Sequence, residues 1–220
     1  MRDEHANISR RVGVVGFFTF LSRIAGLARD SVMAWAFGAT KIADAFYVAF
    51  RIPNLLRRFV AEGALTVAFV PVYTAYLKKT RRDALEAASV VFTYLSLFLT
   101  LLVAAGIIFA PLIVKLIAYG FASDSQKFEM TVYLTRLMFP YIMLISLVAL
   151  AMGILNSLKK FAAPAASPIF LNLAIIFGAV ILSKLFDFPA TGLALGVLIG
   201  GVLQLSLQIP SLAKEGMTMV

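Results

Sequence analysis

The sequence predicts an all-α, polytopic membrane protein, and three observations support this fold class. Hydrophobic residues make up 61% of the 220 residues and charged residues only 14%, a composition that ordinary soluble domains do not have. Apolar runs long enough to cross a bilayer recur along the chain, and a hydrocarbon core of ~30 Å requires about 20 such residues per helix. Half of the basic residues fall in the terminal segments and two of the loops between these runs.

The apolar runs predict six transmembrane helices within one transmembrane unit, 1–220. They cover approximately residues 12–39, 42–77, 87–114, 130–158, 161–183 and 190–213. The second would be ~50 Å long at 1.5 Å per residue, so it must tilt, break or project from the bilayer. Splitting it in two would place Lys78 and Lys79 on the opposite side from Arg10 and Arg11. The charge distribution therefore favours a single span.

The first span carries charge in its middle. Arg23 and Asp30 are seven residues apart and share one face of a helix, whereas Ser22 and Arg29 lie on the adjacent face with Gly26. A charge at the bilayer centre costs ~2.5–3.5 kcal/mol, so these side chains must face protein, water or a ligand. A purely structural pair between an arginine and Asp30 is the alternative. Three glycines are expected to permit close helix packing here: Gly13, Gly16 and Gly26.

The second span is the most charged part of the chain. A helical stripe is expected along it: Asp44, Arg51, Asn54 or Leu55, Arg58 and Glu62, with Arg57 beside it. Pro53 removes a backbone donor, which predicts a kink or break. Polar groups on a broken membrane helix form binding sites in many transporters. Alternatively, Arg57 and Arg58 end a helix and extend to the headgroups, but the apolar pattern resumes at 63–77.

The four later spans are less polar. The third contains no charged residue and has Pro111 near its end, and the fourth has Arg136 and Pro140 in its first part. The fifth contains Asn172. The sixth has glycines at the spacings that allow helices to approach closely: Gly192, Gly196, Gly200 and Gly201.

Six spans place both termini on one side of the membrane. Ten of the twenty basic residues lie on that side, and four lie on the other: Lys41, Lys115, Lys127 and Lys184. The positive-inside rule therefore predicts that both termini of this chain are cytoplasmic. The remaining six basic residues are arginines within the spans, and five of them belong to the first two spans.

The composition excludes several classes of function. The chain has no cysteine and one histidine, His5, in a polar N-terminal segment that is too acidic for a cleaved signal peptide. We therefore expect no metal site and no cofactor. The sequence has neither a paired-carboxylate motif with a nearby base nor a glycine-rich phosphate loop, so an enzyme is not expected. Nucleic-acid binding is not expected either, because the intramembrane arginines are out of reach of a duplex.

The excess of intramembrane arginine indicates an anionic ligand. A guanidinium group presents a planar fork that binds phosphate through two hydrogen bonds and stays charged at any relevant pH. The acids within these spans, Asp30, Asp44 and Glu62, compensate only part of the positive charge. A cavity lined by the first two spans would attract a phosphorylated substrate.

Four segments resemble the MurJ/MviN family of lipid II flippases, which belongs to the multidrug/oligosaccharidyl-lipid/polysaccharide exporter superfamily. They are SRIAGLARD at 22–30, the block around NLLRR and EGA at 43–71, FPYIMLISLVAL with ILNS at 139–157, and GGVLQL with QIP at 200–210. Members of this family have two helical lobes. This chain resembles the N-terminal lobe, so a second, C-terminal lobe is expected outside it.

The resemblance implies that a cationic cavity binds the diphosphate of lipid II and opens alternately to each face of the bacterial cytoplasmic membrane. It places Arg23, Arg29 and Arg57 at substrate-holding positions, Asp44 and Glu62 at sensitive acidic positions and Ala34 at a sensitive small position. Two alternatives are an exporter of another polyprenyl-linked saccharide and a non-transporting scaffold of cell-wall synthesis. Charge-neutral replacement of the arginines would leave the function of a scaffold intact.

Overall fold

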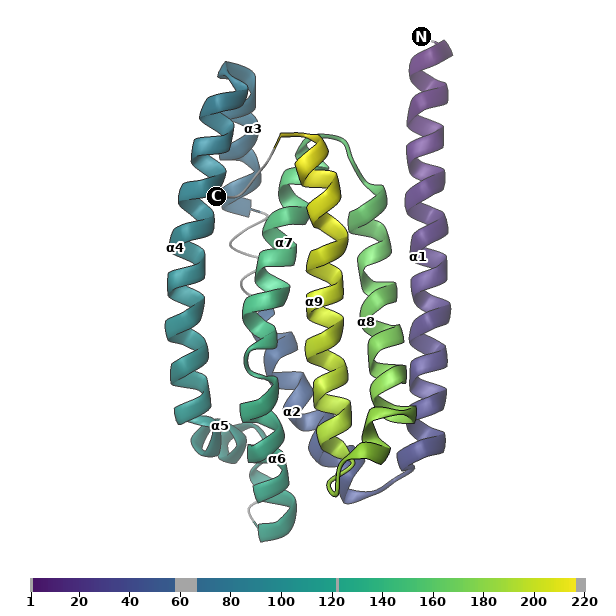
Figure 1. The fold of residues 1–220 in the computed structure, drawn as a ribbon, viewed down its shortest axis with the longest axis vertical. Coiled ribbons are helices and arrows are strands. Elements are labelled where there is room, and N and C mark those ends of the chain that lie inside the picture. The colour runs from purple at the N-terminus through teal and green to yellow at the C-terminus, as the bar shows by residue number, and fades with distance from the viewer. Residues whose placement is uncertain (1, 58–66, 122, 217–220) are drawn as a thin grey trace.

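The structure is a computed structural model that describes residues 2–57, 67–121 and 123–216, with side chains described for 12–55, 67–121 and 123–216 (Figure 1). These residues form a bundle of helices and contain no strand. The helices are α1 (Arg2–Phe37), α2 (Lys41–Arg57), α3 (Val70–Lys79), α4 (Arg81–Ile108), α5 (Ala110–Ile117), α6 (Ser125–Met138), α7 (Tyr141–Ser157), α8 (Ala162–Val180) and α9 (Ala190–Lys214), with short 3-10 turns η2 (Tyr119–Phe121) and η3 (Leu182–Leu185).

Five continuous helical segments of the described chain are long and apolar enough to cross a membrane. They are Val12–Phe37, Arg81–Ile108, Ser125–Ser157, Ala162–Leu185 and Ala190–Lys214. They correspond to five of the six expected spans. The second expected span is divided between α2 and α3, which lie at different heights in the bundle, and the residues between them, 58–66, lie outside the described part (Figure 1).

The break expected at Pro53 does not occur there. α2 continues through Pro53 to Arg57, and Ile52 and Pro53 are both buried. A proline removes only one backbone donor, and burial of this face of the turn keeps it in the helix. The side-chain amide of Asn54 also donates to the carbonyl of Phe50, at 3.1 Å, so it contributes to the same turn.

The third span is shorter at its C-terminal end than the sequence indicated. α4 ends at Ile108, and residues 110–114 belong to α5, whose first turn contains Pro111. Proline fits there because the first turn of a helix needs no intrahelical donor. Arg136 of α6 donates from Nε to the carbonyl of Ile107 at 3.2 Å and so satisfies an unpaired acceptor at the end of α4.

The centre of the bundle is formed by α6 and α7. Tyr141, Ile142, Leu150 and Ile154 are fully or almost fully buried on α7, between elements that come from both halves of the chain. Figure 1 shows α4 along one edge of the bundle and α1 along the other, next to α8. α1 and α4 are therefore peripheral helices, and large parts of both remain uncovered.

Glycines allow α8 and α9 to pack in direct backbone contact, as the sequence predicted for the sixth span. A Cβ added at Gly196 would lie 2.7 Å from the carbonyl oxygen of Ala174, and one at Gly178 would lie 2.7 Å from the carbonyl oxygen of Gly192. The expectation for α1 was wrong at Gly13 and Gly16, because a Cβ there would meet nothing within 4 Å. Their face of α1 is uncovered by the described residues.

The two groups of basic loops lie at opposite ends of the bundle. At one end of the bundle, α1 begins and α3, α7 and α9 end. At the other end, α2, α6 and α9 begin (Figure 1). At the first end, Glu215 accepts hydrogen bonds from Arg81 and pairs with Lys160 at 3.0 Å, which joins the starts of α4 and α8 to the end of α9. Lys160 holds the pKa of Glu215 below its usual range.

The α8–α9 packing makes a stability prediction. Gly196→Ala should lower the free energy of unfolding by ~1–3 kcal/mol, because its methyl group meets backbone atoms that can move only with the helices. Gly16→Ala is the matched control and should be neutral or stabilising, since alanine has the higher helix propensity and the position is open. Thermal unfolding in detergent measures both. An equal loss in the two variants would contradict the packing argument.

Candidate functional site

Asn172 of α8 connects α1 to the bundle. Its side chain is buried, with 7% exposure, and its Nδ2 donates to the carbonyl of Ser22 at 3.4 Å. Its Oδ1 accepts from Nη1 of Arg29 at 3.0 Å. A Cβ on Gly26 would lie 3.7 Å from Nδ2. Ser22, Gly26 and Arg29 therefore share the face of α1 that contacts α8, as their helical spacing predicted.

Every nitrogen of the Arg29 guanidinium is occupied. Nε and Nη2 donate to Oδ1 of Asp30, at 2.9 and 2.7 Å, and Nη1 donates to Asn172. The alternative that an arginine pairs structurally with Asp30 thus describes the state of Arg29 in this structure. The pair is partly solvated, with side-chain exposures of 27% for Arg29 and 58% for Asp30, so exchange of partners costs little.

Arg23 lies on a different face of α1 and lines a cavity. Six residues separate it from Arg29, which corresponds to ~9 Å along the helix and a rotation to another side. The cavity has a volume of about 510 Å³ and lies between α1, α7 and the first turns of α8. Arg23 is exposed and makes no hydrogen bond or ion pair with the described residues. Its charge is available to a ligand.

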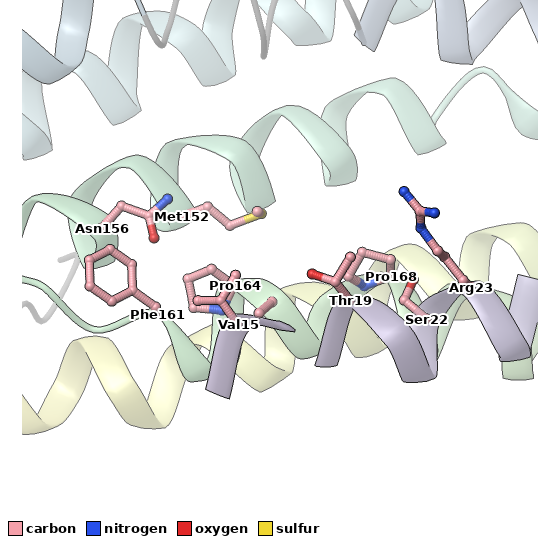
Figure 2. Close-up of a pocket in the computed structure, with 10 residues that line it drawn as sticks. Val15, Thr19, Ser22, Arg23, Met152, Asn156, Phe161, Pro164 and Pro168 are labelled. Carbon is pink, nitrogen blue, oxygen red and sulfur yellow. The ribbon is translucent and has the colours of Figure 1, made fainter. Parts of the chain in front are cut away.

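The lining of the cavity is mixed. Figure 2 draws ten lining residues, with Arg23 and Asn156 at opposite ends of the row and apolar side chains between them. The polar members are Thr19, Ser22, Arg23 and Asn156, and the others are Val15, Met152, Phe161, Pro164, Ala165 and Pro168. Such a surface can contact an amphipathic molecule that has an anionic group, polar substituents and apolar parts.

The stripe expected on α2 is exposed at three described positions, whereas Asn54 is only partly exposed and its amide donates to the carbonyl of Phe50. Asp44, Arg51 and Leu55 lie on the uncovered face, opposite the buried Ala45, Ala49 and Ile52. Asp44, however, pairs with Lys127 of α6 and not with an arginine. Arg57 is the last described residue of α2, without a described side chain, and Arg58 and Glu62 lie outside the described residues.

Three polar residues of the site, Thr19, Asn156 and Asn172, were not identified as site residues from the sequence. Asn172 was visible as an amide in an apolar span, but nothing in the sequence indicated that α1 was its partner. Asn156 lies in the ILNS segment, which the sequence analysis used only for the family resemblance. Ala34, expected at a sensitive position, is exposed near the end of α1, and its carbonyl accepts from the amide of Gly38 at 3.0 Å.

The described residues contain no cluster of three or more histidine, cysteine or acidic side chains that could hold a metal ion. The fold and the site together define a multi-pass α-helical membrane protein with a partly polar cavity between its helices. The particular family follows from comparison with known proteins. A family model described as lipid II flippase MurJ matches residues 33–220, and the chain belongs to that family.

Curated relatives and a solved structure belong to the same family. A lipid II flippase MurJ from Burkholderia cenocepacia is 46% identical over 212 residues, which are 96% of this chain and 41% of that protein. A probable lipid II flippase MurJ from Vibrio cholerae is 40% identical over 92% of this chain and 40% of that protein. A structure described as lipid II flippase MurJ in an inward closed conformation matches with 34% identity and a TM-score of 0.76, over 91% of this chain and 42% of that chain. This chain thus spans about two fifths of the length of these relatives.

The role of Asn172 can be tested by stability. Asn172→Ala should lower the free energy of unfolding by ~1–3 kcal/mol, because it leaves the Ser22 carbonyl and one Arg29 donor without their partner. It should also raise the labelling rate of Gly26→Cys, which lies at the α1–α8 contact. Asn156→Ala is the control, since this exposed amide makes no hydrogen bond with the described residues. Equal effects of the two substitutions would refute the proposed connection.

Proposed function

We propose that this chain is the N-terminal lobe of a lipid II flippase in the bacterial inner membrane, with its cavity receiving the diphosphate of the lipid-linked substrate. The observation that carries the proposal is Arg23, an arginine without an ionic partner among the described residues, at a cavity of about 510 Å³ inside a membrane bundle. Membership of the MurJ family supports the choice of substrate.

Arg23 and Arg29 take different parts in this proposal. Arg23 binds a phosphate oxygen pair first, because its fork is free. Arg29 begins in its bond with Asp30 and Asn172. A diphosphate competes with the Asp30 carboxylate for the same guanidinium nitrogens, so substrate binding releases Asp30 and changes the contact between α1 and α8. Arg57, at the end of described α2, is the third arginine proposed to hold the substrate.

The apolar part of the cavity suits the rest of the molecule. Phe161, Pro164 and Pro168 present surfaces against which a sugar ring or the first isoprene units can pack, and Asn156 offers an amide to hydroxyl groups. The prenyl tail remains in lipid, where no polar group needs a partner. An exporter of another polyprenyl-linked saccharide would use the same diphosphate chemistry and would differ at Asn156 and its neighbours.

Binding to purified complete protein tests the proposal. Arg23→Ala should weaken lipid II binding by about ten- to a hundredfold, the loss expected for one charge-assisted contact. Arg23→Lys should restore it only partly, because an ammonium group supplies the charge without the bidentate fork. Arg82→Ala is the control, since Arg82 is highly exposed and pairs only with Glu86 among described residues.

Binding should be measured at fixed salt with lipid II and with a monophosphate analogue, and the transport rate should be followed in liposomes. A lipid II flippase loses both binding and transport in Arg23→Ala. If Arg23→Ala binds and transports lipid II like the parent protein, the diphosphate site is refuted and the scaffold alternative is favoured.

The orientation in the membrane makes a separate prediction. We expect Lys79 and Lys159 on the cytoplasmic side and Lys127 and Lys184 on the periplasmic side, because the end with more basic residues faces the cytoplasm. Single cysteines in Lys79→Cys and Lys184→Cys can be labelled with an impermeant thiol reagent in intact and in opened cells. Labelling of position 79 in intact cells would overturn this orientation.

A further inference from the structure

Two lysines and two acids join the starts of α2 and α6. Nζ of Lys41 lies 2.6 Å from Oδ2 of Asp124, and Nζ of Lys127 lies 2.5 Å from Oδ2 of Asp44. Each helix start contributes one lysine and one acid, and each lysine pairs with the acid of the other helix. We call these four residues the α2–α6 clasp. It lies at the end of the bundle opposite the start of α1 (Figure 1).

Lys127 is the most enclosed member of the clasp. Its side chain is 18% exposed, and its ammonium group lies 4.1 Å from the centroid of the Phe121 ring as well as beside Asp44. Its backbone amide donates to Oδ1 of Asp124 at 3.1 Å, which caps α6. The hydrogen bond from Lys41 and this amide hold the pKa of Asp124 below its usual range. The clasp is therefore one connected network and not two separate surface pairs.

The clasp fixes how α2 leaves the turn that follows α1. That turn is short and well defined, because Gly38 has a φ of +53° and the hydroxyl of Thr40 donates to the carbonyl of Phe37 at 2.8 Å. Beyond the turn, the buried face of α2 packs against α6 in a shared core that includes Phe46 and Leu134. The clasp therefore lies at the start of the helix whose exposed face carries Arg51.

Asp44 pairs with no arginine among the side chains that the structure describes. Seven residues separate it from Arg51, about 10 Å along the helix. Its partner among the described residues is the ammonium group of Lys127, which lies 83 residues away in the sequence. With Asp44 engaged by Lys127, the position of α2 is one route by which Asp44 can affect a substrate at the arginines.

We propose that Lys127 is a positioning residue for transport and that Asp44 acts through it. The inference rests on the proposed function, because the site that α2 helps to form is the one proposed to receive lipid II. Within this role, the clasp holds the start of α2 against α6 and so keeps the charged face of α2 in place. Its members can exchange partners for water when the two helices separate at this end of the bundle.

Exchange of the two charges tests the proposal in the complete protein, in a background without cysteines. Met130→Cys serves as a probe, since Met130 is partly buried next to the clasp and packs against the core shared by α2 and α6. The variants are Lys127→Glu, Asp44→Lys and the two combined. Lys115→Glu is the control, because Lys115 is an exposed lysine at the same end that makes no ion pair with the described residues.

The rate of labelling at position 130 with an impermeant thiol reagent and the rate of lipid II transport are measured at fixed salt. Lys127→Glu should raise the labelling rate and lower the transport rate by about tenfold each, within the range that contacting residues give in double-mutant cycles. The combined exchange should restore both rates to within about threefold of the parent protein, and Lys115→Glu should change neither. Because it removes the charge without adding repulsion, Lys127→Gln covers the case in which Lys127→Glu does not fold.

Failure to restore either rate in the combined variant, or equal effects of Lys115→Glu and Lys127→Glu, would overturn the proposal. So would parental rates in Lys127→Gln. The labelling rate needs no substrate, so it separates this proposal from the proposed function. If the parent protein does not transport lipid II, the proposed function fails, and the labelling rates alone decide whether the clasp positions α2.

Discussion

The position of α1 depends on the buried amide of Asn172. Both side-chain hydrogen bonds that the described residues form between α1 and α8 involve this group, and one of them orients Arg29. An amide in the interior of a membrane bundle must have its donors and acceptor satisfied, because neither lipid nor apolar side chains can do so. This requirement aligns a peripheral helix, whose remaining face is largely uncovered, with the packed α8–α9 pair. The glycine contacts hold α8 against α9, and α8 in turn holds Arg29 of α1 through Asn172.

The charged residues of the first two spans separate into two groups according to their partners. Arg29, Asp30 and Asp44 are paired in this structure, with Asn172 and Lys127 completing their networks. Arg23 and Arg51 are exposed and make no ion pair with the described residues. The paired residues account for how the helices are held, and the others carry positive charge that no ionic partner among the described residues neutralises. A membrane cavity for an anionic group needs paired and unpaired charges. A fully neutralised cavity would not attract the anion, and helices whose buried charges all lacked partners would not pack stably.

The predicted elements that needed correction all contain proline or glycine, residues that are compatible with more than one local structure. The periodicity of apolar residues indicated long spans, but the chain uses Pro111 to begin a new helix and carries Pro53 within an uninterrupted one. A proline at either position is locally compatible with a helix start or with a helix interior whose neighbours are packed. Whether the helix starts or continues at a proline depends on burial and on distant hydrogen-bond donors. One such donor is Arg136, which bonds the carbonyl of Ile107 at the end of α4. Gly13 and Gly16 are similar, because small residues permit close packing without requiring it.

The sequence by itself determined the fold class, the approximate spans, the two groups of basic loops and the concentration of arginine in the first two spans, because these follow from composition and from the thickness of a bilayer. It also determined that Ser22, Gly26 and Arg29 share a face, since helical spacing fixes this. Only the tertiary structure decided which charge meets which partner. Arg29 and Asn172 are 143 residues apart and Asp44 and Lys127 are 83 residues apart, and helical periodicity carries no information about which helix lies opposite another. Those partners are set by how the whole bundle packs.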